Sequence, residues 1–146
     1  MLVGKVMSSQ VVSVTNATTI RAAAELMRVH NVGALPVFQD DMLVGIVTDR
    51  DIVVRALAAS GGALRMDARV TGIMSDDVIT CSFDEDVENA AGLMGERQVR
   101  RLLIQNHVGA LVGIVSVGDI AEHVSEELAG QILGEISEAR ARDAHR

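Results

Sequence analysis

Two short stretches of the chain place a carboxylate three positions after a hydroxyl residue. The first pairs Thr48 with Asp51 and the second pairs Ser116 with Asp119. Each follows the apolar run Val-Gly-Ile-Val, which predicts a buried strand, while the hydroxyl and acid predict a capping box that opens a helix. A strand-turn-helix junction of this kind offers free N–H groups and a positive dipole end, where a phosphate can bind. The two stretches, called here the Asp51 corner and the Asp119 corner, are candidate ligand sites, and capping without a ligand is the alternative.

The elements that must position these corners are duplicated as well. A short apolar lead-in, an amphipathic helix and a buried strand precede each corner, so each half is predicted to run strand, helix, strand, strand, helix. A period of this length in two copies predicts two halves that bury their faces against each other. The matching positions, 67 residues apart, are Val3, Val6 and Met7 with Val70, Ile73 and Met74; Ile20, Ala23, Ala24 and Met27 with Val87, Ala90, Ala91 and Met94; and residues 32–38 with 99–105.

The repeats define the predicted domain boundaries. We assign residues 1–60 to the first domain, 61–69 with Gly61-Gly62 to a linker, and 70–126 to the second domain. Residues 127–146 form a predicted helical extension and tail, with 138–146 as a solvated tail of mixed charge. Its apolar stripe packs either on the same chain or on a partner. The stripe, which predicts one continuous helix, comprises Ile120, Val124, Leu128, Ile132 and Ile136.

Composition narrows the class of protein. The chain has 146 residues, 49% of them apolar, which is enough for a sizeable core. Its net charge of −7 argues against a nucleic-acid binder, and two Phe with no Trp or Tyr give no stacking platform. No apolar run is long enough to span a membrane and no secretory signal is evident, so we expect a cytoplasmic protein without membrane contact. Cys81 is the single cysteine, so no internal disulfide can form.

Motifs for catalysis are missing from the sequence. There is no Gly-rich phosphate loop, no dinucleotide fingerprint and no local Cys-His or Ser-His-Asp pattern. The histidines, which share no metal-ligand spacing, are His30, His107, His123 and His145. We therefore expect no catalytic residues and no metal site.

The order of the motifs resembles a known family. The doubled V-G-I-V-[TS]-x-x-D, the V-G-A-L-P-V strand, and the lead-ins ending in Val6-Met7-Ser8 and Ile73-Met74-Ser75 together resemble a tandem pair of CBS domains, a Bateman module, over about residues 1–125. The resemblance implies an α/β (α+β) fold of two pseudo-symmetric β-α-β-β-α halves packed sheet to sheet. It also implies a homodimer whose clefts between the halves bind AMP, ADP, ATP, NAD or S-adenosylmethionine.

The resemblance assigns roles to particular residues. Asp51 and Asp119 match the family's ribose-binding acid, which accepts charge-assisted hydrogen bonds from a vicinal diol, and Thr48 and Ser116 match the hydroxyl of its turn. The strand that lines the adenine pocket matches Val32, Gly33 and Ala34 in the first half and Val99, Arg100 and Arg101 in the second. Arg100 and Arg101 in the second half, and Arg50 in the first, are the candidate phosphate ligands. Pro36 of the first half is replaced by Leu103, so the two sites are not fully equivalent.

These observations favour a non-catalytic, energy-sensing regulatory module that binds an adenosine ligand and acts on a separate effector protein. A ligandless dimeric interaction scaffold is the alternative, and a melting temperature that no nucleotide shifts would favour it. An enzyme acting on a nucleotide needs a base or metal that the sequence does not show. Nucleic-acid binding is the least supported hypothesis, and salt-sensitive retention of RNA or DNA would be needed to revive it.

Overall fold

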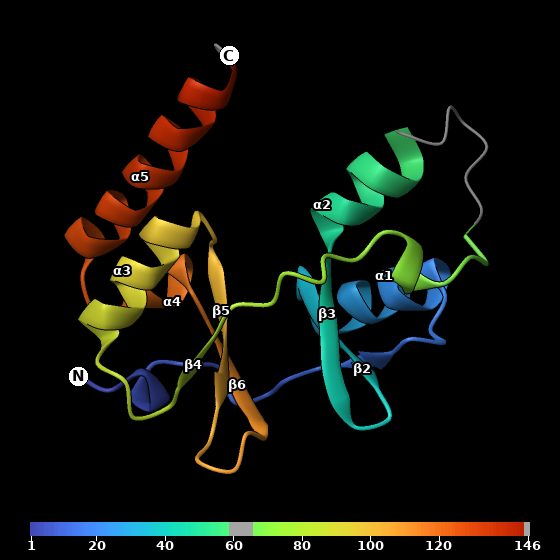
Figure 1. Cartoon of the computed structure of the whole chain (residues 1–146), viewed down its shortest axis with the longest axis horizontal. Coiled ribbons are helices and arrows are strands. Elements are labelled where there is room, and N and C mark those ends of the chain that lie inside the picture. Colours follow the sequence, from blue (N-terminus) through green and yellow to red (C-terminus); the bar gives the residue numbers. More distant parts are fainter. Residues whose placement is uncertain (59–65, 145–146) are drawn as a thin grey trace. The chain divides into compact units, whose positions relative to one another are not determined.

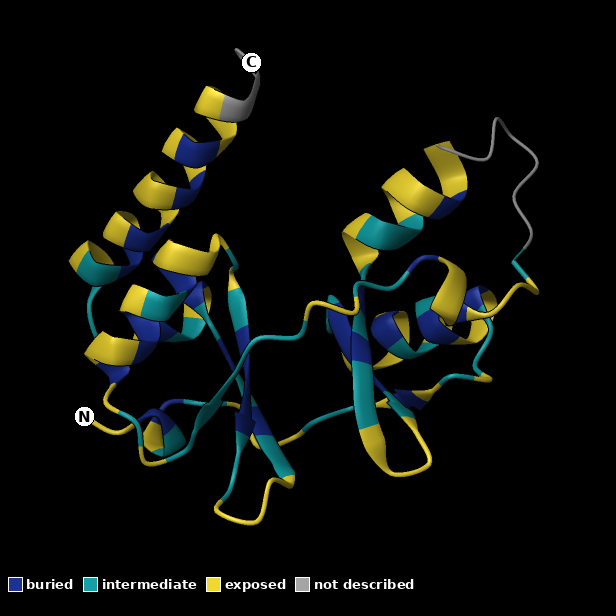
Figure 2. Ribbon diagram, viewed as in Figure 1, coloured by how far each residue is buried: buried dark blue, intermediate teal, exposed yellow. Residues whose placement is uncertain are grey.

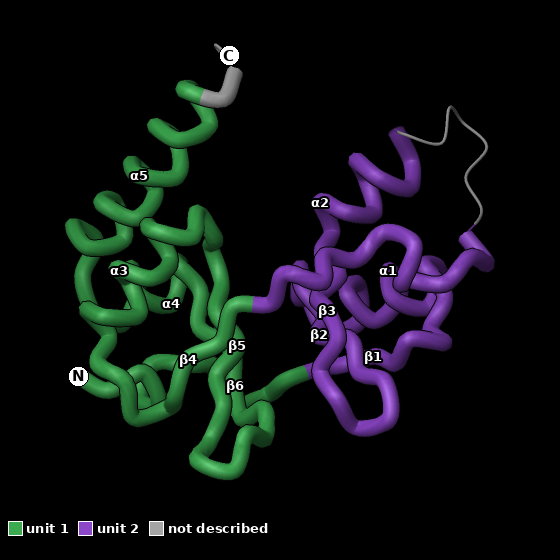
Figure 3. The backbone as a smooth tube through the Cα atoms, in the orientation of Figure 1, with its two compact units in different colours: residues 1–11, 79–146 green, residues 12–78 purple. Residues whose placement is uncertain are grey.

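The computed structural model describes residues 1–58 and 66–144. The chain divides into two compact units: unit 1 is Met1–Val11 with Ile79–Arg146, and unit 2 is Val12–Val78 (Figure 3). Residues 61–65 of the predicted linker and residues 145–146 of the predicted tail lie outside the described residues. None of the helices within the described ranges combines the length and apolar character needed to cross a bilayer.

Unit 2 carries the first repeat without its lead-in (Figure 1). Its three-stranded sheet has the order β1-β2-β3, with β1 parallel to β2 and β2 antiparallel to β3. Thr19 begins α1, because its side chain accepts the Ala22 N–H at 3.1 Å, and Asn31 ends it in the left-handed conformation. The elements are β1 (Val14–Thr15), α1 (Ile20–His30), β2 (Ala34–Gln39), β3 (Met42–Thr48), α2 (Asp49–Asp51), which continues as π-helical turns in η2 (Ile52–Ala58), and the 3₁₀ turn η3 (Val70–Gly72).

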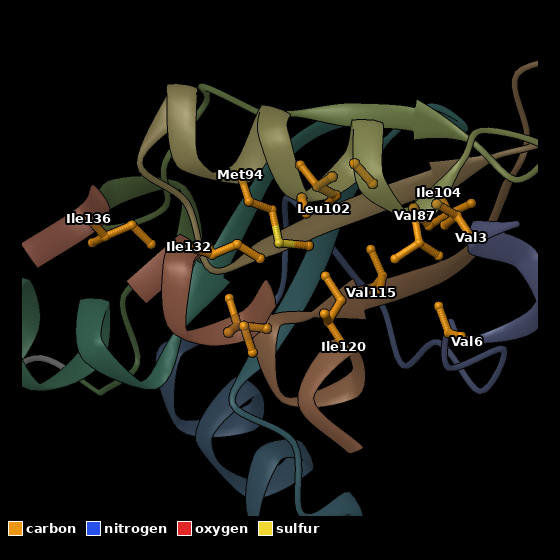
Figure 4. Close-up of a cluster of buried hydrophobic side chains, with 14 residues drawn as sticks. Val3, Val6, Val87, Met94, Leu102, Ile104, Val115, Ile120, Ile132 and Ile136 are labelled. Carbon is orange, nitrogen blue, oxygen red and sulfur yellow. The ribbon is translucent and has the colours of Figure 1, made fainter. Parts of the chain in front are cut away.

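Unit 1 carries the second repeat with the same topology, in the order β4-β5-β6. The predicted helix face is confirmed, since Val87, Ala90, Ala91 and Met94 are all buried in its core (Figure 4). In the first repeat Ile20, Ala23 and Met27 of the predicted face are buried. The elements are η1 (Val3–Lys5), β4 (Thr80–Ser82), α3 (Val87–Arg97), β5 (Arg101–Gln105), β6 (Leu111–Ser116), α4 (Val117–His123) and α5 (Glu126–Ala144).

The two lead-ins are exchanged between the repeats. Ser8 and Ile114 exchange backbone hydrogen bonds of 2.8 and 3.0 Å, so the first lead-in extends the sheet of the second repeat. Ser75 and Ile46 exchange two of 2.9 Å, so the second lead-in extends the sheet of the first repeat. The apolar side chains of each lead-in are buried in the core that it joins, Val3 and Val6 in unit 1, and Val70 and Ile73 in unit 2.

Glycine in each Val-Gly-Ile-Val run permits this exchange. A Cβ at Gly45 would lie 2.8 Å from the Ser75 carbonyl oxygen, and one at Gly113 would lie 2.9 Å from the Ser8 carbonyl oxygen. Both distances are too short for a side chain without a backbone shift. The glycines of the repeated motif therefore serve close backbone approach.

The C-terminal stripe is not one helix, contrary to the sequence-based expectation. Ser125 interrupts it, because its hydroxyl accepts the Leu128 N–H at 3.2 Å and begins α5 as a new helix. The expected tail at 138–146 is also wrong for residues 138–144, which continue α5, with Ala139 buried. The helix packs on its own chain, against α3 and α4, and its buried residues form a stripe along one side (Figure 2).

Candidate functional site

The Asp51 corner is a complete capping box at the junction of β3 and α2. The Asp51 N–H donates to Thr48 Oγ1 at 3.1 Å, and the Thr48 N–H donates to Asp51 Oδ2 at 2.9 Å. These reciprocal bonds hold the carboxylate in one orientation at the start of the helix, and only 13% of its side chain is exposed. The sequence-based prediction of a capping box here is confirmed.

The Asp119 corner has the same geometry at the junction of β6 and α4. The Asp119 N–H donates to Ser116 Oγ at 3.1 Å, and the Ser116 N–H donates to Asp119 Oδ2 at 2.8 Å. Only the second carboxylate oxygen is used in each box. Within the described residues, Oδ1 of both aspartates accepts no hydrogen bond, so each corner keeps an oxygen that can accept hydroxyl donors.

The strand that precedes each hairpin lies against its corner. The Asp49 N–H donates to the Gly33 carbonyl at 2.9 Å, and the Val117 N–H donates to the Arg100 carbonyl at 3.0 Å. Ala34 pairs with Thr48 in one sheet, and Arg101 pairs with Ser116 in the other. The structure therefore brings residues 32–34 to the Asp51 corner and residues 99–101 to the Asp119 corner, each within its own unit.

The cationic side chains differ between the corners. Arg50 is exposed, and its backbone N–H donates to Asp49 Oδ1 at 2.8 Å. Arg100 is also exposed, whereas Arg101, at the start of β5, is half-buried. Gly33 and Ala34 hold the corresponding positions of the first repeat, so the strand brings arginines to the Asp119 corner alone.

Arg55 is a functional candidate that the sequence analysis missed. Its Nε lies 3.8 Å from Asp51 Oδ1, and its Nη1 donates to the carbonyls of Ile73 at 3.3 Å and Met74 at 3.4 Å. The spacing of four from Asp51 on a helix was the available signal, because such positions share a face. His123, 68 positions later, pairs instead with Glu122 at 3.7 Å.

A family model described as the CBS domain matches residues 3–57 and again residues 70–126. The chain belongs to the CBS-domain family. Each match contains one of the two corners and one lead-in, so a CBS domain coincides with a repeat of the sequence rather than with a compact unit.

This CBS pair is similar to several known proteins. CBS domain-containing protein YhcV of Bacillus subtilis is 41% identical, over 90% of this chain and 91% of its own. Hypoxic response protein 1 of Mycobacterium tuberculosis is 38% identical, over 88% of each chain. The CBS domain pair of protein MJ0100, solved in complex with 5′-methylthioadenosine and S-adenosyl-L-methionine, is 28% identical with a TM-score of 0.75, covering 87% of this chain and 98% of that one.

One solved neighbour contains metal ions. A crystal structure of Hypoxic Response Protein I contains two coordinated zinc ions; it is 35% identical with a TM-score of 0.71, covering 85% of this chain and 99% of that one. In the described part of this CBS pair, no three His, Cys, Asp or Glu side chains come together as metal ligands do.

Burial, followed by the negative charge of Glu85, raises the pKa of the Cys81 thiol to about 11, so this sulfur is a poor nucleophile at neutral pH.

Proposed function

We propose that this CBS pair is a non-catalytic regulatory module that binds an adenosine-containing ligand at the Asp51 and Asp119 corners. The observation that carries the proposal is the Oδ1 of each capping carboxylate, which accepts no hydrogen bond among the described residues, at a corner whose helix start donates a backbone N–H to Gly33 or Arg100. The complex of the MJ0100 CBS pair with two adenosyl compounds supports the same ligand class.

Each residue of a corner has a distinct part in this proposal. The ribose diol donates two hydrogen bonds to the aspartate, which accepts them as a charged and therefore strong acceptor. Thr48 and Ser116 fix the carboxylate through the capping box. The backbone of residues 32–34 and 99–101 reads the adenine edge. Arg50, Arg100 and Arg101 bind the phosphates of AMP, ADP, ATP or NAD, and S-adenosylmethionine is the alternative without phosphate.

Regulation follows from differential binding. A ligand shifts the protein between two arrangements only if it binds one of them more tightly. We propose that the protein acts as a homodimer and that the arrangement favoured by the ligand changes its contacts with a separate effector protein.

Calorimetric titration with AMP, ATP, NAD and S-adenosylmethionine tests this function. We expect micromolar binding, about 8 kcal/mol of binding free energy, by at least one of them. Asp51→Ala and Asp119→Ala should each remove one binding event, and the double variant should remove both. Each substitution also loses a helix cap, at about 0.5–2 kcal/mol of unfolding free energy.

Asp49→Ala is the matched control, because this neighbouring carboxylate is exposed and holds only the Arg50 N–H. Its affinity for the ligand should equal that of the wild type. Unchanged affinity in the Asp51→Ala/Asp119→Ala protein would disprove the ribose assignment.

A ligandless interaction scaffold is the second candidate function. The exposed valines of η2 favour it, since Val53 is 55% and Val54 42% exposed in the described structure. Absence of heat with all four ligands, together with an unshifted melting temperature, would select it.

A further inference from the structure

Arg55 contacts three groups that have different roles, all within unit 2. Its Nε faces Asp51 Oδ1 at 3.8 Å, and its Nη1 donates to the Ile73 carbonyl at 3.3 Å and the Met74 carbonyl at 3.4 Å. The guanidinium presents five N–H donors in a fixed plane, so one side chain can serve an acceptor on each side. Arg55 thus connects the proposed ligand carboxylate to the second lead-in.

The lead-in that Arg55 holds is the route by which the chain leaves unit 2. Ser75 exchanges two backbone hydrogen bonds of 2.9 Å with Ile46 of β3, and unit 1 resumes at Ile79. Figure 1 shows this segment running past β3 near the start of the α2 helix. We call residues 73–75 the crossover segment. The second repeat passes from unit 2 to unit 1 between Val78 and Ile79, a few residues after this segment. A change in the hydrogen bonds of the segment therefore acts close to that link.

A ligand at the Asp51 corner must compete with Arg55. Oδ2 already accepts the Thr48 N–H, so ribose hydroxyls approach Oδ1, the same oxygen that faces Arg55. The 3.8 Å separation is an ion pair without a direct hydrogen bond, and short hydroxyl hydrogen bonds can displace it. A guanidinium released from Oδ1 keeps the Ile73 and Met74 carbonyls as its acceptors. Its N–H donors then serve the crossover segment alone.

The second repeat lacks this connection. At the position of Arg55 it has His123, which lies 3.7 Å from Glu122. Among the described residues, no cation pairs with Asp119. A ligand at the Asp119 corner therefore meets a carboxylate with no partner to displace.

We propose that Arg55 is a positioning residue that couples ligand occupancy of the Asp51 corner to the hydrogen bonding of the crossover segment. The inference rests on the proposed function, since it needs a ligand at Asp51. It makes the Asp51 corner the signalling site of the pair and leaves the Asp119 corner as a binding site only. By linkage, a ligand at the Asp51 corner changes the affinity for any partner that fixes the crossover segment, and that partner changes the ligand affinity by the same factor.

Hydrogen exchange of the full chain tests the coupling, with 5′-methylthioadenosine and AMP as probes. The Met74 N–H donates to the Val70 carbonyl, the Ser75 N–H to the Ile46 carbonyl and the Ile46 N–H to the Ser75 carbonyl. On binding, these three amides should exchange about fivefold more slowly, at the lower end of typical couplings. Arg55→Met should abolish this slowing, while probe affinity, measured by calorimetry, should not fall, because the cation that competes for Asp51 Oδ1 is gone. Arg55→Lys, which keeps the charge but not the planar fork, should restore part of it.

His123→Met is the matched control, because it changes the corresponding position of the second repeat and should leave the slowing intact. Binding without slowing in the wild type, or slowing that survives Arg55→Met, overturns the coupling and leaves the proposed function standing. Absence of binding by both probes and by the four ligands above overturns the proposed function and the coupling with it.

Discussion

The Asp51 and Asp119 corners share their backbone and differ in their surroundings. Both have the reciprocal capping box and the N–H donated to the preceding strand, with distances that agree within 0.1 Å. Around this common frame, the first corner has Arg55 beside its acid and small residues on the strand, whereas the second has Arg100 and Arg101 on the strand. The comparison teaches that local hydrogen bonds fix the backbone of the corner, so the neighbouring side chains can differ without changing it.

The largest difference between the repeats is the helix that covers the second. In unit 1, α5 buries Ile136, which is 1% exposed, against α3 and α4. We expect Ile136→Ala to cost about 2–5 kcal/mol of unfolding free energy, because it leaves a cavity in this core. Urea unfolding followed by hydrogen exchange should place the loss in unit 1 and leave Val12–Val78 unchanged.

Leu133→Ala is the control for that helix, since Leu133 also lies on α5 but is 41% exposed. Its effect should stay within about 0.5 kcal/mol. A loss at Ile136 as small as the loss at Leu133 would contradict the packing of α5 in the unit 1 core.

The glycines of the repeated motif should behave alike and thereby test the exchange of lead-ins. We expect Gly45→Ala and Gly113→Ala each to cost about 1–3 kcal/mol, because the new Cβ presses on the carbonyl of Ser75 or Ser8. Gly45→Ala should speed the amide hydrogen exchange of residues 70–75, and Gly113→Ala should speed that of residues 3–8. Gly92→Ala, in α3 with nothing within 4 Å of its Cβ, should instead be neutral or stabilising; a comparable loss there would contradict the assignment.

The smallest expected effect concerns a strand position that holds Val14 in the first repeat and Cys81 in the second. Burial raises the Cys81 pKa from 9.0 to about 11, so the folded protein keeps the thiol protonated at a pH where the unfolded chain ionises. The stabilisation of the folded state by the protonated thiol is complete below about pH 9 and is lost as the pH rises through about 11. Alkylation by iodoacetamide at pH 8 should be slow when folded and fast in urea, and Cys81→Val should remove the pH-dependent loss. Rapid alkylation of the folded protein would contradict this assignment.

Much of the fold could be predicted because it is encoded locally. The helix faces Ile20 to Met27 and Val87 to Met94 follow from apolar spacing, and the two capping boxes follow from a hydroxyl and an acid three positions apart. The proximity of residues 32–34 and 99–101 to the corners came from the family resemblance and agrees with the backbone contacts. Their roles in ligand binding stay predictions.

The errors and omissions depend on contacts that spacing does not encode. The two lead-ins carry nearly the same residues, so the sequence could not say which sheet each one joins. The period of four runs unbroken across Val124 and Leu128, which concealed the break at Ser125. Arg55 was missed because its acceptors, the carbonyls of Ile73 and Met74, lie 18 and 19 positions away and belong to the backbone.

The exchanged lead-ins also set an order of assembly during synthesis. All of unit 2 lies in one run, Val12–Val78, which a ribosome completes first. Ser8 meets its partner only after Ile114 has been made, 106 residues later. In the sequence, unit 2 therefore lies between the two segments of unit 1, and Ser8 is made before unit 2 but paired after it. Until Ile114 has been made, the strand-pairing groups around Ser8 have no partner in β6 and can pair with other chains.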